Sequence, residues 1–311
     1  MDLNGRMEKL MNYKGISAPP VTPTYQDGTV NYEAIGKFVD HLVQTGVNGV
    51  FVSGTTGEFT SLSMSERKMI AEAWLKFGKD KLDMIIIQCG SSCMDETKEM
   101  VRHAKENGAD AVACISPSFL KPMNEEYLSD YLEEVASEAP NTPFMYYHLP
   151  SFTGVKVDMS KLMSLCYEKI ETFAGLKCSS ENMYEMIVPL KFKPKPLKVF
   201  YGFDWQFLGG LAMGADCAVC TSFNFIGNKF VEITKAYKNG NMKEAQSIQH
   251  KIALDFNPFC SKYHGVAFAK IATTLISGID MGQPRRPLHQ FSEKQIKEIK
   301  AFLTKEGYLK K

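Results

Sequence analysis

Short apolar runs that alternate with longer amphipathic stretches are the feature of this sequence that most restricts its fold. Eight runs have the length and the nearly continuous apolar character of buried parallel strands. They are Gly15–Val21, Gly49–Ser53, Met84–Cys89, Ala111–Ile115, Phe144–Tyr147, Phe173–Lys177, Lys198–Tyr201 and Cys217–Thr221. Strands that alternate with helices are the repeating unit of α/β proteins. The alternation therefore predicts a parallel sheet that is covered by helices.

The stretches between these runs have the signatures of helices. Tyr32–Gln44 repeats apolar residues with a 3.6-residue period, and Ser63–Phe77 opens with a capping-box spacing of serine and glutamate. Glu96–Asn107 ends at a glycine, and Asn124–Glu138 ends before a proline. The strand count and the chain length favour closure into a (β/α)8 barrel, the TIM barrel. A doubly wound open sheet is the main alternative, because periodicity alone does not exclude it.

The chain continues well beyond the eighth apolar run. Three further helical stretches lie near Met242–Asp255, Lys262–Ser277 and Ser292–Thr304. We interpret residues 236–311 as a C-terminal helical extension of a barrel that spans about residues 15–235. Since no linker, low-complexity tract or repeat interrupts the sequence, we expect a single domain over residues 1–311.

Composition argues against several classes of function. The 36 Lys and Arg residues nearly balance the 35 Asp and Glu residues, so a net charge of +1 provides no basic excess for nucleic acid. No apolar run approaches the ~20 residues of a membrane span, and the polar segment 1–14 lacks a signal-peptide core. We therefore expect a cytoplasmic protein without nucleic-acid or membrane partners.

Eight cysteines raise the question of a metal site. Cys217 and Cys220 have the spacing of half a zinc site, but no second pair or matching histidine pair accompanies them. Residues three apart on a strand also point to opposite faces. We therefore expect no bound metal and interpret the cysteines as small buried apolar residues of a reducing compartment.

The sixth apolar run ends in a lysine, which is unusual because burying an ammonium group is costly. Period-2 alternation places Phe173, Gly175 and Lys177 on one face of this strand. If that face points inward, Gly175 leaves space beneath Lys177 at the barrel mouth, where TIM barrels carry their chemistry. Desolvation there favours a neutral, nucleophilic amine. The alternative is a lysine that reaches from the strand end into solvent.

Two other runs also end in polar residues. Tyr147 could project into the same mouth and move protons as a phenol, whereas His148 falls on the opposite face and suits a structural role. After the second run, Gly54-Thr-Thr-Gly-Glu58 combines a tight turn with hydroxyls and amides that suit a small carboxylate. The loop lacks the spacing of a P-loop, which argues against nucleotide binding.

Together these segments resemble the N-acetylneuraminate lyase and dihydrodipicolinate synthase family of class I pyruvate-dependent aldolases. The resemblance extends from about Gly15 to Pro287, and the animal type of lyase is the most similar branch. The similar stretches are Gly54–Glu58, Lys79–Asp83, Phe119–Pro122, Tyr146–Val155, Gly175–Lys177 and Ser277–Gly282. The resemblance implies a TIM-barrel aldolase that needs no cofactor, because a covalent imine on lysine is the electron sink. It also implies a homotetramer.

The resemblance implies a role for each matching residue. Lys177 would form a Schiff base with the keto carbon of a 2-oxo acid such as pyruvate. Tyr147 would shuttle protons in a relay with Thr55, and Thr56 with the loop amides would hold the substrate carboxylate. Ser179 would help to orient the substrate. The residues that would contact the polyhydroxyl tail of a sugar acid are Gly202, Asp204 and Thr221.

The expected substrate-binding region departs from the family pattern, and the departure at Trp205 matters most. Trp205 stands where the sialate lyases carry a glutamate that would accept hydrogen bonds from the glycerol side chain of the sugar. An indole offers one donor and no acceptor. Losing such a charged acceptor would weaken binding by on the order of 1.5–3 kcal/mol. Nearby, Cys220 replaces a customary glycine, and Ser222-Phe223 replaces Thr-Tyr.

Two classes of function follow from these residues. The first is an aldolase that cleaves N-acetylneuraminate to N-acetylmannosamine and pyruvate; Trp205 supports the alternative that the same chemistry acts on a 2-keto-3-deoxy aldonate. The second class is a barrel that has lost catalysis and serves as a binding or structural protein. Because Lys177 and Tyr147 are both present, the enzyme is the favoured interpretation.

Overall fold

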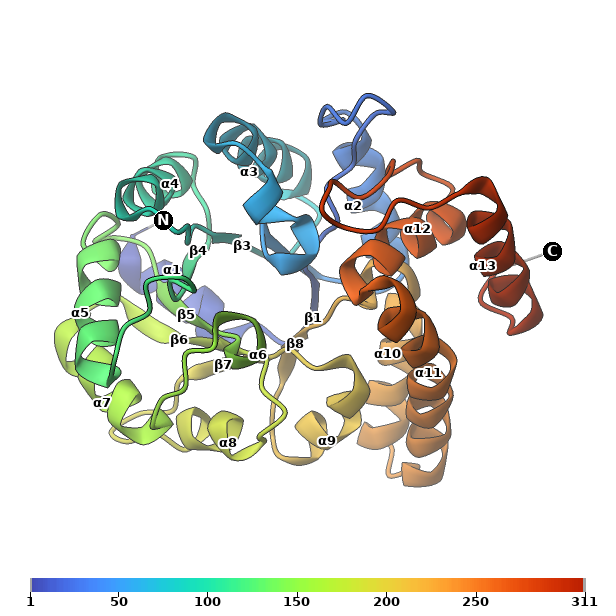
Figure 1. The fold of residues 1–311 in the computed structure, drawn as a ribbon. Helices are drawn as coiled ribbons and strands as arrows, with labels where there is room; N and C mark the ends of the chain where they lie inside the picture. Colours follow the sequence, from blue (N-terminus) through green and yellow to red (C-terminus); the bar gives the residue numbers. More distant parts are fainter. Residues whose placement is uncertain (1, 310–311) are drawn as a thin grey trace.

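Eight parallel strands close into a barrel in the computed structural model, which describes residues 2–309 (Figure 1). Each strand pairs with the next one in the sequence, and the last pairs with the first. The strands are β1 (Gly15–Ala18), β2 (Gly49–Val52), β3 (Met84–Gln88), β4 (Ala111–Ile115), β5 (Phe144–His148), β6 (Phe173–Cys178), β7 (Lys198–Tyr201) and β8 (Cys217–Val219). The predicted TIM barrel is confirmed, and the open sheet is excluded.

Helices alternate with the strands and form the outer layer of the barrel (Figure 1). They are α2 (Ala34–Gln44), α3 (Met64–Gly78), α4 (Met94–Glu106), α5 (Glu125–Ala136), α7 (Met159–Lys169), α8 (Tyr184–Leu190), α9 (Phe207–Ala212) and α10 (Phe223–Lys238). The short helix α6 (Pro150–Thr153) lies at the mouth of the barrel instead (Figure 1). The capping box predicted at the start of α3 is present, with Ser63 and Glu66 each bonded to the other's backbone amide. Within residues 2–309, no helix is both long enough and apolar enough to cross a membrane.

The N-terminal helix α1 (Leu3–Asn12) closes one end of the barrel, a role that its polar sequence did not reveal. Figure 1 looks along the barrel, and α1 lies behind the strands. Leu10 is buried in the same apolar cluster as the residues of the barrel interior. Lys9 pairs at 2.6 Å with Asp110, directly before β4, and Lys198 at the start of β7 donates to the carbonyl of Met11 at 3.3 Å. These contacts seal the end where the strands begin.

Strand β6 contains a bulge that decides which way its lysine points. Phe144 of β5 pairs with Phe173, but the next residue, Met145, pairs with Gly175, so that Ala174 is an extra residue. Ala174 packs inside the barrel, whereas Phe173 packs in the outer core under the helices. The predicted face was therefore correct for Lys177 and wrong for Phe173, because the bulge interrupts the alternation.

Gly175 is required by the approach of the neighbouring strand. Its φ is 152°, and a Cβ at this position would overlap the backbone of Lys198 in β7. The sequence had suggested instead that Gly175 leaves space beneath Lys177. In the structure, a glycine is needed here because of the bulge in β6 and the close contact between β6 and β7.

The C-terminal helices gather on one side of the barrel (Figure 1). They are α11 (Met242–Tyr263), α12 (Gly265–Ser277) and α13 (Glu293–Lys305). The sequence analysis placed a helical stretch near Met242–Asp255, whereas helix α11 continues to Tyr263, although it contains Pro258. Aromatic contacts join these helices to α10, since the ring centroids of Phe225 and Phe256 are 5.5 Å apart and those of Phe225 and Phe268 are 6.1 Å apart.

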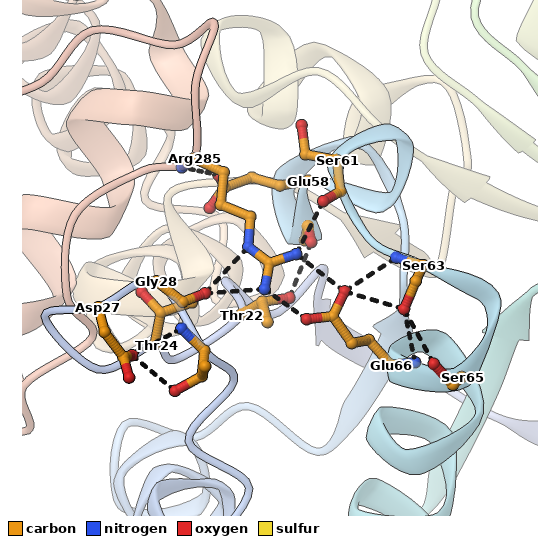
Figure 2. A network of polar contacts seen from close by, with 12 residues as sticks. Thr22, Thr24, Asp27, Gly28, Glu58, Ser61, Ser63, Ser65, Glu66 and Arg285 are labelled. Atoms are coloured by element: carbon orange, nitrogen blue, oxygen red, sulfur yellow. Dashed lines mark hydrogen bonds and ion pairs between the residues drawn. The ribbon is translucent and has the colours of Figure 1, made fainter.

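Arg285, in the loop after α12, fastens the C-terminal segment to the loops of the barrel (Figure 2). Its guanidinium donates to the carbonyls of Gly28 and Ser61, each at 2.8 Å, and to the carboxylate of Glu66 at 2.9 Å. The hydrogen bonding from Arg285 to this carboxylate lowers the pKa of Glu66 to about 2. Because Glu66 also caps α3, one carboxylate connects that helix to the C-terminal loop.

Gly175→Ala is expected to lower the free energy of unfolding by on the order of 3 kcal/mol, because the new Cβ meets backbone atoms that have no room to move. Urea unfolding measures the change. Gly214→Ala is the matched control, since Gly214 has a φ of 102° with nothing within 4 Å of the added Cβ. Equal losses in the two variants would contradict a steric requirement at Gly175.

Candidate active site

A cavity of about 360 Å³ opens at the end of the barrel where the strands finish. This is the end at which TIM barrels position reactive side chains. The cavity is lined by every site residue that the sequence analysis predicted: Thr55, Thr56, Tyr147, Lys177, Ser179, Gly202, Asp204, Trp205 and Thr221. Residues from five different strand ends and the loops after them thus meet in one space.

Lys177 and Tyr147 lie against each other at the centre of this cavity. They are paired positions of neighbouring strands, so the β5–β6 ladder holds them side by side. The Lys177 nitrogen lies 4.1 Å from the ring centroid of Tyr147 and 4.5 Å from that of Phe51. The lysine is only 4% exposed, and within residues 2–309 no carboxylate pairs with its nitrogen. The amine therefore lies in a largely apolar, aromatic setting beside the phenol.

The phenol of Tyr147 has one hydroxyl partner. Its oxygen lies 3.1 Å from the hydroxyl oxygen of Thr55, and either group can donate. The Phe51 ring packs edge-on against the Tyr147 ring, with centroids 5.3 Å apart. The phenol thus lies between the apolar ring of Phe51 and the hydroxyl of Thr55. This arrangement suits general acid–base chemistry.

The loop after β2 forms a tight turn, η1 (Thr55–Gly57), that presents polar groups to the cavity. The hydroxyl of Thr56 bonds at 2.9 Å to that of Thr221, which follows β8. Glu58 ends the turn in the left-handed region, with a φ of 58°. In the described part of the chain, the backbone amides of Thr55 and Thr56 have no assigned acceptor. Two free amides beside a hydroxyl form a site that suits an anion.

Glu58 anchors this loop through a buried ion pair that the sequence analysis did not identify. Its carboxylate accepts from the Lys270 nitrogen of α12 at 2.9 Å and from the backbone amide of Arg285 at 2.6 Å. The two charged side chains are 1% and 2% exposed. Burial lowers the pKa of Lys270, and the neighbouring Glu58 opposes this effect. The ion pair therefore ties the position of the threonines to a C-terminal helix.

Ser179 and Gly202 line the cavity next to each other after β6 and β7. A Cβ at Gly202 would overlap the hydroxyl of Ser179, so the glycine makes room for that side chain. The hydroxyl of Ser179 is thus held beside the backbone of the following strand end.

Asp204 and Trp205 lie in the turn η3 (Asp204–Gln206) after β7. One carboxylate oxygen of Asp204 accepts from the backbone amide of Ser222 at 2.7 Å and also from its hydroxyl. Burial raises the pKa of Asp204, and the hydrogen bonds from Ser222 oppose this shift. Asp204 therefore links the turn to the start of α10, besides lining the cavity.

Two other predicted features lie outside the cavity. His148 is buried on the outer face of β5, where its Nε2 bonds to Glu185 at 2.9 Å and its Nδ1 approaches the Tyr146 hydroxyl at 3.4 Å. This agrees with the structural role expected for His148. Cys217 packs inside the barrel and Cys220 in the outer core, so the two thiols occupy opposite faces of the chain.

Sequence reasoning missed the part of the wall that the helices provide. The additional lining residues include Phe152 of α6, Phe225 of α10, Cys260 of α11, and His264, Val266 and Phe268 at the start of α12. The sequence analysis treated Lys262–Ser277 as one helix and so overlooked the break at His264. The adjacent pair His264-Gly265 was the signal that could have located this break.

The fold and the cavity define a TIM-barrel protein of the aldolase type. The chain belongs to the Dihydrodipicolinate synthetase family, whose sequence profile matches residues 12–306. An N-acetylneuraminate lyase from Gallus gallus is 42% identical over 93% of this chain and 95% of that protein. The N-acetylneuraminate lyase from Homo sapiens is 39% identical over 95% of this chain and 93% of that protein. The solved Proteus mirabilis N-acetylneuraminate lyase has a TM-score of 0.91 and 33% identity, covering 96% of this chain and 99% of that one.

Lys270→Met is expected to lower the free energy of unfolding by about 3–5 kcal/mol, because it leaves the Glu58 carboxylate buried without its cation. Lys251→Met is the matched control. It removes a 2.6 Å pair with Asp255 whose lysine is 47% exposed, and such a pair contributes about 0–1 kcal/mol. Urea unfolding compares the two variants. Similar small losses in both would show that the buried pair does not anchor the loop.

Proposed function

We propose that this protein is a class I aldolase that cleaves N-acetylneuraminate to N-acetylmannosamine and pyruvate through a Schiff base on Lys177. The observation that carries the proposal is the buried Lys177 amine, 4.1 Å from the ring centroid of Tyr147 in a cavity at the barrel mouth. The similarity to N-acetylneuraminate lyases along almost the whole chain supports this choice of substrate. No cofactor enters the proposed reaction.

The reaction begins with attack of the neutral Lys177 nitrogen on the C2 ketone of the open-chain sugar acid. Loss of water from the resulting carbinolamine leaves a protonated imine between Lys177 and C2. This cation withdraws electrons from the C3–C4 bond, so it replaces a metal ion as the electron sink. The substrate carboxylate next to C2 is held by the Thr56 hydroxyl and by the free amides of Thr55 and Thr56.

Tyr147 manages the proton of the C4 hydroxyl. As phenolate, or through the carboxylate of the bound acid, it accepts this proton while the C3–C4 bond breaks and C4 leaves as an aldehyde. The electron pair of that bond forms an enamine with the imine nitrogen as acceptor. Protonation of the enamine at C3 and hydrolysis of the imine release pyruvate and restore Lys177. Thr55, 3.1 Å from the phenol oxygen, relays the proton.

The aldehyde end of the substrate lies toward the loops after β6, β7 and β8. Ser179 orients the substrate near the imine. The groups proposed to contact its polyhydroxyl tail are Gly202, Asp204, Trp205 and Thr221. Asp204 supplies a carboxylate there, although one of its oxygens is already bonded to Ser222.

The proposed assembly is a homotetramer in the cytoplasm. An exposed apolar patch supports self-association, because Phe119, Leu120 and Met123 are 89%, 84% and 88% exposed in the single chain. Apolar patches of this kind commonly mark interfaces between proteins. The patch follows β4 at the same end of the barrel as the cavity.

Borohydride reduction in the presence of pyruvate tests the covalent step. The peptide that contains Lys177 is expected to gain the mass of a reduced pyruvate imine, as measured by mass spectrometry after digestion. Lys177→Met is expected to abolish the label, and Lys251→Met, outside the cavity, to retain it. A folded wild-type protein that remains unlabelled at Lys177 would refute the Schiff-base proposal.

Trp205→Glu tests the substrate assignment at the other end of the cavity. Restoring a charged acceptor is expected to raise kcat/KM for N-acetylneuraminate by roughly ten- to a hundredfold, whereas Trp205→Phe, without an acceptor, leaves it low. Pyruvate release measures both variants beside a 2-keto-3-deoxy aldonate. If the wild-type protein cleaves only the shorter acid, the N-acetylneuraminate assignment is wrong and the alternative substrate replaces it.

A further inference from the structure

The break between α11 and α12 places a histidine at the rim of the cavity. His264 lies between Tyr263, the last residue of α11, and Gly265, the first residue of α12. Its exposed side chain lines the active-site cavity and also a neighbouring cavity of about 440 Å³. Phe152 and Val266 likewise line both cavities, so His264 belongs to the partition between them.

The backbone of His264 is held in an unfavourable conformation. Its φ of 69° and ψ of 128° lie in a region that residues with a Cβ rarely adopt. Gly265 follows directly and could take a positive φ without steric penalty, yet the strained conformation falls on the histidine. Strain of this kind is concentrated at ligand-binding and catalytic positions, where the surrounding structure enforces it.

The hydrogen bonding of His264 determines which ring nitrogen is free. Nδ1 accepts from the backbone amide of Val266 at 3.4 Å, so in the neutral ring the hydrogen resides on Nε2. The Phe152 ring packs edge-on against the imidazole, with centroids 6.0 Å apart, and restrains its plane. Among the residues from 2 to 309, none accepts a hydrogen bond from Nε2. The rim therefore carries an N–H donor that has no acceptor among the described residues.

A hydrogen-bond donor matters for substrate binding at this position because the cavity wall is largely aromatic. Trp205, Phe225 and Phe268 line the space together, and their side chains offer one indole N–H and no acceptor. A substrate tail rich in hydroxyls loses hydrogen bonds with water on entering such a space. Polar groups that replace those bonds thus decide whether a long tail binds well.

We propose that His264 is a specificity-determining residue of this site and that its Nε2–H donates to a hydroxyl of the polyhydroxyl tail of the sugar acid. The proposal rests on the proposed aldolase function and adds a residue to it. His264 contacts the tail, while the bond-breaking chemistry belongs to Lys177 and Tyr147 on the strands. Loss of the donor therefore affects substrates according to their tail and leaves the imine chemistry unchanged.

Kinetics on two substrates test the proposal. His264→Phe keeps an aromatic ring beside Phe152 and removes the donor. Its kcat/KM for N-acetylneuraminate is expected to fall by about tenfold, mainly through KM. For an analogue whose glycerol side chain is shortened to one carbon, the change is expected to stay below about twofold. Equal losses on the two substrates, or no loss on either, would contradict the proposal.

One further variant distinguishes loss of the Nε2–H donor from a change in the helix cap or backbone, and a second serves as a control. His264→Asn accepts a positive φ and caps α12, but its shorter side chain falls short of the position of Nε2. It is expected to show the same tail-dependent loss as His264→Phe, and full activity would assign the effect to the cap instead. His250→Phe, an exposed position on α11 that lines neither cavity, is expected to leave both substrates unchanged.

Borohydride trapping distinguishes failure of this proposal from failure of the proposed function. Pyruvate should label Lys177 in His264→Phe at the wild-type rate, because pyruvate has no tail. A wild-type protein that never forms the imine refutes the aldolase chemistry itself. Normal trapping combined with losses that do not depend on the tail refutes only the role of His264.

Discussion

The register between β5 and β6 is the constraint on which the site depends. Phe144 pairs with Phe173, and an unbroken ladder from that point would set Lys177 opposite His148, on the outer face of the barrel. The bulge at Ala174 shifts the register by one residue, so that Lys177 pairs with Tyr147 and points inward. Because of this one extra residue, the Lys177 side chain lies beside the Tyr147 phenol instead of facing the helices. Two strands, rather than flexible loops, determine the separation of these groups.

The C-terminal helices complete the site instead of merely extending the barrel. Lys270 of α12 neutralises Glu58 at the end of the threonine turn, and the backbone amide of Arg285 bonds to the same carboxylate. Removing two charges from water is costly, and this pair persists because each oxygen of Glu58 has its own donor. A shift of α12 would therefore move the turn that carries Thr55 and Thr56. The threonine turn and the aromatic residue Phe268 of the cavity wall are in this way connected through α12.

The sequence predicted the elements whose signals are local. All eight strands and the capping box of α3 follow from patterns of a few residues, and Lys177 and Tyr147 are recognisable as polar ends of apolar runs. The bulge in β6 was not predictable, because it depends on how Gly175 meets the backbone of β7. The passage of α11 through Pro258 and the partner of Glu58 were also missed. Each of these depends on contacts between segments far apart in the chain, which periodicity does not record.

The residues around Lys177 and the residues of the opposite cavity wall are held by different parts of the fold. The amine, the phenol and the threonine turn are held by strands and by a buried ion pair, so substitutions there disturb the barrel itself. The far side of the cavity is built from the turn at Trp205 and from helix surfaces that include Phe225 and His264. These side chains belong to the outer layer, and their replacement leaves the β5–β6 ladder intact. In an aldolase of this construction, substitutions in this wall can therefore be made without disturbing the pairing of Lys177 with Tyr147. Trp205 and the strained His264 both belong to this part of the cavity wall.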